Sequence, residues 1–139
     1  TVASGANSHA EGNTTEASGA NSHAEGNSCH AIGTNSHAEG LQTQAYHRSQ
    51  HVFGEYNILD NASQTTTARG EYIEIVGNGE VSGGTINYSN ARTLDWSGNE
   101  MIAGNLTIGG DTTLTKERLA MLNGLTVATV AQTKTYLGF

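Results

Sequence analysis

The chain has 139 residues, of which 35% are apolar, 6% aromatic and 14% charged, and it contains 18 glycines and no proline. This composition is too poor in large apolar side chains for a conventional monomeric core, so association between chains is the expected source of further burial. The formal net charge of −7, the lack of Lys or Arg before Arg48 and the short apolar runs predict no nucleic-acid partner and no membrane insertion.

The N-terminal third repeats with a step of seven residues. Alanine stands at positions 3, 10, 17, 24, 31, 38 and 45, and glycine at 5, 12, 19, 26, 33, 40 and 54. Two alternating versions make a 14-residue unit, with Ser-His-Ala-Glu-Gly at 8–12, 22–26 and 36–40 and a looser x-Ala-x-Gly at 16–19 and 30–33. A repeat of this kind decides the architecture before any local propensity does.

The repeat favours a solenoid of short strands. A coiled coil needs two apolar positions per heptad, and this repeat offers one alanine and a helix-breaking glycine. Collagen needs glycine at every third residue. Disorder stays open because Gly, Ser, Asn and Thr dominate, but the strict Ala-x-Gly spacing argues against it. We expect each half-unit to form a short strand and a polar turn, so that 14 residues close one coil.

Alternation along a strand divides each half-unit into two faces. Ala10 and Gly12 are predicted to point into a narrow coil, and His9 and Glu11 to point outward. The His and Glu face is constant between units while the other face varies, so we predict that it forms the contact with copies of the same chain. In the fourth unit, larger apolar residues predict a plug that ends the roll near residue 54. The predicted contact residues are His9, Glu11, His23, Glu25, His37, Glu39, His51 and Phe53.

The second half is predicted to be a β-rich knob at 55–110, with a short helix and tail after it at 111–139. Strands are expected to begin at 56–58, to cover 72–76 before a Gly-Asn-Gly turn at 77–79, and to form a hairpin over 91–108 about 97–99. A helix is expected from Thr115 to a stop at Asn123-Gly124, and 125–139 stays open between strand and frayed helix. The expected knob core comprises Tyr72, Ile73, Ile75, Tyr88, Leu94 and Trp96.

The Ala-Ser-Gly and Ser-His-Ala-Glu-Gly units resemble the head repeats of trimeric autotransporter adhesins and, more closely, repeats in tail fibre and baseplate proteins of phages and prophages of Gram-positive bacteria. The segments RGEYIEIVGNG at 69–79 and SNARTLDWSGNEMIAGNLTIGG at 89–110 are similar to the region that lies C-terminal to these repeats in the phage proteins. The resemblance implies a parallel homotrimer, a left-handed β-roll and a place in the virion's host-attachment apparatus, with other tail or baseplate proteins and a host-cell polysaccharide as partners.

No set of residues in the sequence predicts an enzyme. Trp96 and Tyr88 are speculative contacts for a sugar, although burial is the favoured role for the single Trp. Three histidines per coil near a trimer axis could hold a metal or an anion, but hydrogen-bonded structural histidines are favoured, so we predict no metal and no cofactor. Two alternatives remain: a glycan-degrading fibre with acids at subunit clefts, and a bacterial adhesin head on the cell surface. The acids considered are Glu71, Glu74, Glu80, Asp95 and Glu100.

Overall fold

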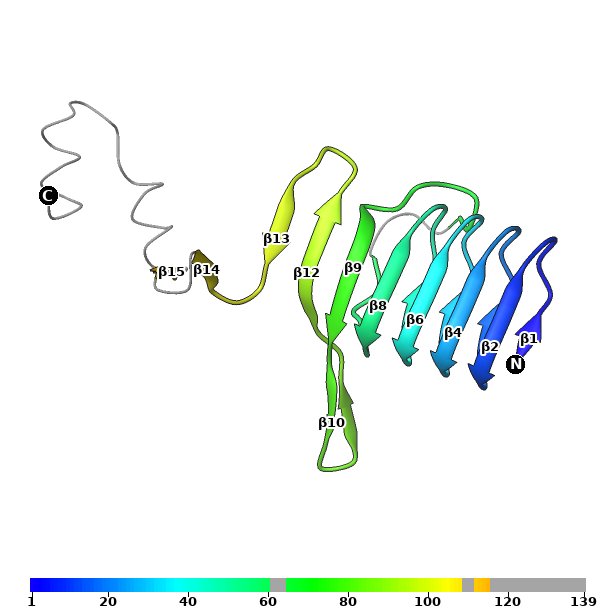
Figure 1. Cartoon of the computed structure of the whole chain (residues 1–139), viewed down its shortest axis with the longest axis horizontal. Coiled ribbons are helices and arrows are strands. Elements are labelled where there is room, and N and C mark those ends of the chain that lie inside the picture. The colour runs from blue at the N-terminus through cyan, green and yellow to red at the C-terminus, as the bar shows by residue number, and fades with distance from the viewer. Residues whose placement is uncertain (61–64, 109–111, 116–139) are drawn as a thin grey trace, which may run out of the picture. The chain divides into compact units, whose positions relative to one another are not determined.

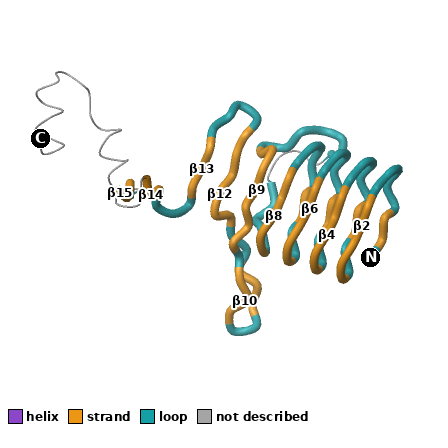
Figure 2. The backbone as a smooth tube through the Cα atoms, viewed as in Figure 1, coloured by secondary structure: helices purple, strands orange, loops and turns teal. Residues whose placement is uncertain are grey.

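The computed structural model describes residues 1–60, 65–108 and 112–115. Strands and loops make up these ranges, which contain no helix, so the predicted all-β class is confirmed for them (Figure 2). In the described residues, no helix is long and apolar enough to cross a membrane. The helix predicted after Thr115 and the tail at 125–139 lie outside the described residues. The chain divides into two units, Thr1–Ala103 and a second that begins at Gly104.

The N-terminal part of the first unit is a β-solenoid of about four turns, in which each coil combines a short and a long strand (Figure 1). The short strands are β1 (Val2–Ala3), β3 (Glu16–Ala17), β5 (His30–Ala31) and β7 (Gln44–Ala45). The long strands are β2 (His9–Asn13), β4 (His23–Asn27), β6 (His37–Leu41) and β8 (His51–Glu55). The predicted solenoid with a 14-residue spacing is therefore confirmed.

Both kinds of strand stack in parallel, and each residue pairs with the equivalent residue of the next coil. His9 pairs with His23 and then His37, and the alanines and glutamates keep the same register. The short strands pair in the same way, Ala17 with Ala31 and Ala31 with Ala45. A repeat of 14 residues thus becomes columns of identical side chains that run along the solenoid.

Alanine columns fill the interior, as the alternation predicted. Ala24 and Ala38 of the long strands and Ala31 of the short strands are fully buried. Buried hydroxyl groups beside them bond to the backbone, for example Ser22 Oγ to the Gly19 carbonyl oxygen at 2.7 Å. The core widens at the C-terminal end of the solenoid, where Val52 and then Ile75 replace alanine in the column.

The glycines of the long strands do not point into the coil, which corrects the prediction made for Gly12. Gly12, Gly26 and Gly40 are exposed, and their φ angles are 102°, 106° and 107°. A Cβ on Gly26 would lie 2.2 Å from the carbonyl oxygen of Gly40 in the next coil. Glycine is required there because the backbone is left-handed and the coils approach closely, not because the interior is narrow.

Residues at the corners of each coil also have positive φ angles. They are not glycines, and they are spaced seven residues apart. Asn7, Asn21 and Asn35 occupy one column of corners, with φ between 55° and 57°. Asn7 Nδ2 donates to Asn21 Oδ1, and Asn21 Nδ2 donates to Asn35 Oδ1, both at 3.2 Å. Asparagine tolerates the left-handed conformation better than most residues, so this column serves both backbone geometry and coil stacking.

Replacing Asn21 with alanine is expected to lower the free energy of unfolding by about 1–2 kcal/mol, because alanine is strained at this φ. Asn21→Gly removes the same amide contacts but relieves the backbone, so its expected loss is smaller. Urea denaturation monitored by circular dichroism measures both. An equal loss in the two variants would contradict the importance of the left-handed corner.

After β8 the 14-residue spacing ends, but the sheet continues. β9 (Tyr72–Asn78) pairs in parallel with β8, and the chain between them is tied down by buried polar groups. Gln50, which stands where earlier units have serine, donates from Nε2 to Asp60 Oδ2 and to the Tyr72 carbonyl oxygen, both at 3.2 Å. Asp60 Oδ2 also accepts from the Tyr72 amide at 3.1 Å. The end of the solenoid is therefore held by a hydrogen-bonded network as well as by Val52.

The rest of the first unit extends the sheet. β10 (Glu80–Ser82) and β11 (Thr85–Asn87) form a hairpin, β12 (Asn90–Asp95) pairs antiparallel with β9, and β13 (Glu100–Ile102) pairs antiparallel with β12. The seven-stranded order is β13-β12-β9-β8-β6-β4-β2. The second unit contains β14 (Leu106–Ile108) paired with β15 (Thr112–Leu114).

The hairpin predicted about 97–99 is confirmed for β12 and β13. Asp95 closes its turn, because its carboxylate accepts from the Ser97 and Asn99 amides and from Asn99 Nδ2, each at 2.8 Å. These bonds, led by the Asn99 side chain, hold the pKa of Asp95 below its ordinary value. The predicted second strand breaks after Ile102, because 106–108 pairs with β15 instead.

Three other predictions for the knob need correction. Residues 56–58 are not a strand, since β8 ends at Glu55 and Tyr56 takes a φ of 42°. The chain does not turn at 77–79; it reverses at Gly83-Gly84, where φ is positive. In the expected core only Ile75 is fully buried, Tyr88 is 51% exposed, and Tyr72, Ile73, Leu94 and Trp96 are partly buried.

Candidate functional site

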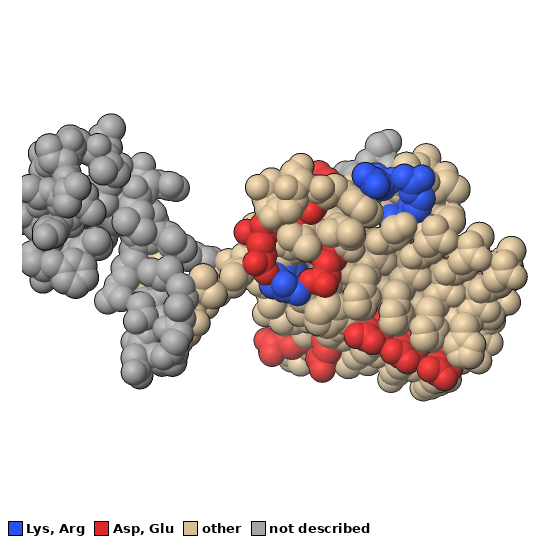
Figure 3. Space-filling view, turned by 45° about the horizontal axis from the view of Figure 1, so that its top comes forward, with Lys and Arg blue, Asp and Glu red and all other residues tan. Residues whose placement is uncertain are grey.

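The outward face of the long strands carries two parallel columns, one of imidazoles and one of carboxylates. Because the strands pair in register, the repeat places the histidines above one another two residues away from the glutamates. The members are His9, His23, His37 and His51, and Glu11, Glu25 and Glu39. We call this set the His–Glu ladder. In Figure 3, a row of acidic side chains runs across the stacked coils.

The imidazole rings contact each other along the ladder. Ring centroids of His23 and His37 are 4.7 Å apart with planes at 17°, and those of His37 and His51 are 4.9 Å apart at 13°. Phe53 continues the aromatic contacts, with its ring 5.1 Å from that of His51. Protonation of these stacked rings would bring like charges together, so the column depends on the carboxylates beside it when it becomes cationic.

Glu11 and Glu39 each lie within ion-pair distance of imidazoles of two coils, whereas Glu25 lies within that distance of His37 alone. Nε2 of His37 is 3.7 Å from Glu25 Oε1 and 4.0 Å from Glu39 Oε2, and Nε2 of His51 is 3.9 Å from Glu39 Oε1. These distances allow ion pairs with protonated histidine but exceed a hydrogen bond. Nε2 of His23, His37 and His51 is shielded from solvent without a hydrogen-bond partner. The ladder thus has hydrogen-bonding or metal-ligating capacity that one chain does not use.

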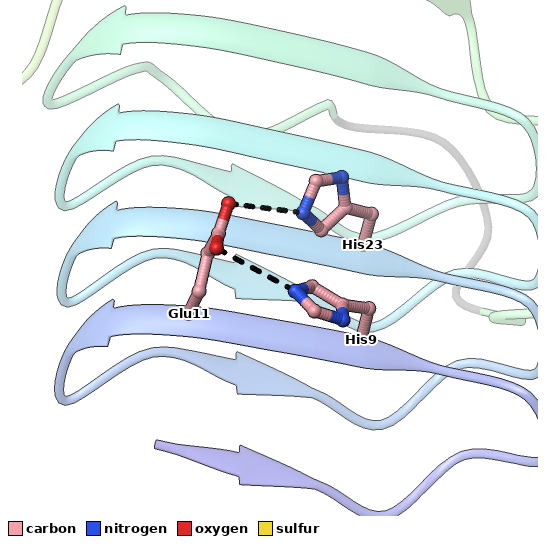
Figure 4. A group of neighbouring side chains, drawn as sticks. All are labelled: His9, Glu11 and His23. Carbon is pink, nitrogen blue, oxygen red and sulfur yellow. Dashed lines mark ion pairs between the residues drawn. The ribbon is translucent and has the colours of Figure 1, made fainter.

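The first interval of the ladder differs from the others. The His9 and His23 rings meet edge to face, with centroids 5.0 Å apart and planes at 73°. His9 Nε2 lies 3.6 Å from Glu11 Oε2, and His23 Nε2 lies 3.9 Å from Glu11 Oε1 (Figure 4). Two imidazole nitrogens therefore face one carboxylate. A second cluster of potential ligands comprises Glu25, His37 and Glu39.

The face formed by the short strands carries no such column. Its outward positions hold Glu16, His30 and Gln44 in successive coils, so the side chain changes at each step. One ion-pair contact is present, between His30 Nδ1 and Glu16 Oε2 at 3.5 Å. This pair offers one imidazole and one carboxylate, which makes it a useful matched control for the ladder.

Tyr88 lines a hollow beside the last coil. The hollow has a volume of about 350 Å³ and combines apolar and amide side chains: Gln44, Asn57, Ile58, Leu59 and Tyr88. The Asn57 side chain already hydrogen-bonds to the backbone, since its Oδ1 accepts from the Gln44 amide at 2.9 Å. The Tyr88 ring is therefore the main aromatic surface that the hollow offers. The sequence had singled out Tyr88 but gave no sign of the residues around it, which come from two other segments, at 44 and 57–59.

Trp96 does not share this hollow. The Arg69 guanidinium carbon lies 4.2 Å from the centroid of its ring, in cation–π geometry. That contact occupies one face of the indole, and Nε1 is shielded without a hydrogen-bond partner. The two speculative sugar contacts are thus in different places, and Tyr88 is the more accessible of them.

Two of the acids considered for glycan hydrolysis are paired with one arginine. Arg92 on β12 contacts Glu74 on β9 through Nη2 and Glu100 on β13 through Nη1, the latter at 2.8 Å. The bond to Glu100 raises the pKa of Arg92 above its ordinary value. A carboxylate held by a permanent cation is a poor general acid, so this arrangement supports a role in strand pairing.

Comparison of the chain with models of known protein families, with curated proteins and with solved structures gave no match.

Proposed function

We propose that this chain is a structural and binding segment of a phage tail fibre or baseplate protein, and that three parallel copies form a left-handed β-roll through the His–Glu ladder. The observation that carries this proposal is a constant ladder of histidine and glutamate on a solenoid filled mainly by alanine and small hydroxyl side chains. Alanine burial contributes little free energy per coil, whereas ordering the 14 residues of each coil costs conformational entropy. Packing between chains supplies the missing burial.

The ladder suits such a contact for two reasons. Its Nε2 atoms at His23, His37 and His51 lack hydrogen-bond partners within the chain, so donors or acceptors of another copy can satisfy them. Polar pairs inside an interface also set register and partner number more than they add stability. Identical columns from three chains can therefore fix the register in which the coils of one chain align with those of the next.

The mechanism we propose is presentation. A stack of coils with in-register hydrogen bonds is a rigid spacer, and three copies hold three equal surfaces away from the virion for attachment to a host-cell glycan. The hollow at Tyr88 is the candidate contact, because an aromatic ring beside amide groups suits the apolar faces and hydroxyl groups of sugars. We propose no catalytic role, and other tail or baseplate proteins as neighbours in the virion.

Sedimentation equilibrium and incubation with Gram-positive cell-wall polysaccharide test this proposal together. We expect a mass three times that of the chain, and retention of polysaccharide whose length does not change. A well-folded single copy at micromolar concentration would contradict the trimer. Shortened polysaccharide would contradict the binding role and favour a glycan-degrading fibre.

A further inference from the structure

We propose that His9, Glu11 and His23 form a binding site for a divalent transition-metal ion, with Zn²⁺ as the ion that the ligands fit best. All three ligands come from one chain, so the site differs from an axial arrangement shared by three copies. It also revises the expectation from the sequence that the chain binds no metal.

The geometry of the first interval of the ladder carries this inference. The ligand atoms His9 Nε2, Glu11 Oε1 or Oε2 and His23 Nε2 all lie within 4.8 Å of one another. Zinc bonds of about 2.0–2.2 Å place ligand atoms about 3.4 Å apart in a tetrahedral site. Each imidazole nitrogen lies at a separation close to that value from one Glu11 oxygen, His9 Nε2 at 3.6 Å from Oε2 and His23 Nε2 at 3.9 Å from Oε1. The His9 and Glu11 side chains are exposed, so their rotation can bring one oxygen and both nitrogens to an ion.

The ring orientations agree with this assignment. His9 and His23 meet edge to face instead of stacking like the later pairs, and both turn a nitrogen toward Glu11 (Figure 4). Nε2 of His23 is shielded from solvent and makes no hydrogen bond. A ring nitrogen that is withdrawn from water and unpartnered, in the tautomer with its proton on Nδ1, can ligate a cation placed between it and the carboxylate.

The chemistry of the donor set selects the class of ion. Two imidazoles and one carboxylate are ligands that Zn²⁺ and its neighbours among the transition metals prefer, whereas Mg²⁺ and Ca²⁺ prefer oxygen ligands. The chain as a whole has a net charge of −7, which favours the approach of a cation. Three protein ligands leave a fourth position open for water or for another ligand. The second cluster, Glu25, His37 and Glu39, has a single imidazole and is the weaker candidate.

Calorimetric titration of Zn²⁺ into the tag-free full chain, first stripped of metal with a chelator, tests the proposal at neutral pH. We expect one tight site per chain, which excess Mg²⁺ does not block. Glu11→Gln and His9→Gln should each weaken Zn²⁺ binding at least about tenfold, because each removes a ligand. Circular dichroism establishes that the variants remain folded.

The matched control is the double variant Glu16→Gln/His30→Gln. It removes one carboxylate and one imidazole that also lie within ion-pair distance, but from the short-strand face and without a third ligand. Its Zn²⁺ affinity should stay within about twofold of the parent, since a missing ligand costs much more. Unchanged affinity in Glu11→Gln, an equal loss in the control, or one ion per three chains would each overturn the single-chain site. The loss of affinity in the ligand variants is measured per chain, and the stoichiometry distinguishes a single-chain site from one shared by three copies.

Discussion

Replacing Gly26 with alanine is expected to unfold the solenoid. Gly26 has a φ of 106°, which L-residues rarely adopt, and holding alanine there costs about 1–3 kcal/mol. In addition, the new Cβ would lie 2.2 Å from the Gly40 carbonyl oxygen, and a backbone atom cannot move aside as a side chain can. The coils would have to separate at this point, which breaks the backbone hydrogen bonds between β4 and β6. We expect a total loss above about 3 kcal/mol, measured by urea denaturation.

Substitutions at two other glycines distinguish the two causes of that loss, which are the close contact of the new Cβ and the strain of the left-handed backbone. Gly33→Ala creates a comparable contact, with its Cβ 2.0 Å from the His47 carbonyl oxygen, but the backbone there is not left-handed. Gly83→Ala creates strain alone, because φ is 60° and nothing lies within 4 Å of the new Cβ. The expected order of destabilisation is Gly26→Ala, then Gly33→Ala, then Gly83→Ala at about 1–2 kcal/mol. A loss in Gly83→Ala equal to that in Gly26→Ala would show that close coil stacking matters little.

These glycines also show what the sequence revealed and what it did not. The repeat length, the inward alanines and the outward His and Glu residues can be deduced from periodicity, and the structure confirms them. The direction of Gly12 cannot be deduced in this way, because alternation assumes an extended backbone throughout, and φ turns positive at that residue. A glycine in a repeat has two possible causes, a small space or an unusual φ, and spacing alone does not distinguish them.

The second half was harder to predict because its contacts join distant segments. Gln50 replaces the serine of earlier units, but its partners Asp60 and Tyr72 lie 10 and 22 residues further along the chain, where the repeat gives no guide. The Gly-Asn-Gly at 77–79 has the composition of a turn, yet β9 runs through Asn78 and Gly79 lies buried against backbone. Here the close packing of Gly79 against neighbouring backbone outweighs the tendency of the Gly-Asn-Gly sequence to form a turn. The ladder was the part of the candidate site that could be predicted, since it depends only on the period.

If the chain forms the trimer proposed above, Glu25→Arg is expected to dissociate it into single chains. Glu25 lies near the middle of the ladder, and its carboxylate is 3.7 Å from His37 Nε2 and about one-third exposed in the single chain. In a parallel trimer built on the ladder, the substitution brings three guanidinium groups toward one another and removes one of the two carboxylates that face His37. Like charges placed together in an interface cost several kcal/mol, which exceeds what polar contacts between coils can offset. Sedimentation equilibrium at micromolar concentration measures the change in mass.

Glu16→Arg is the control for this variant, because it makes the same change of charge on the short-strand face. Glu16 also lies beside an imidazole, with its carboxylate 3.5 Å from His30 Nδ1, and it is similarly exposed. We expect this variant to keep both the mass of a trimer and the circular dichroism of the parent. The dissociated Glu25→Arg chains should instead lose part of the β-strand signal, because packing between chains no longer adds to their burial. Dissociation by Glu16→Arg alone would place the subunit contact on the short-strand face instead.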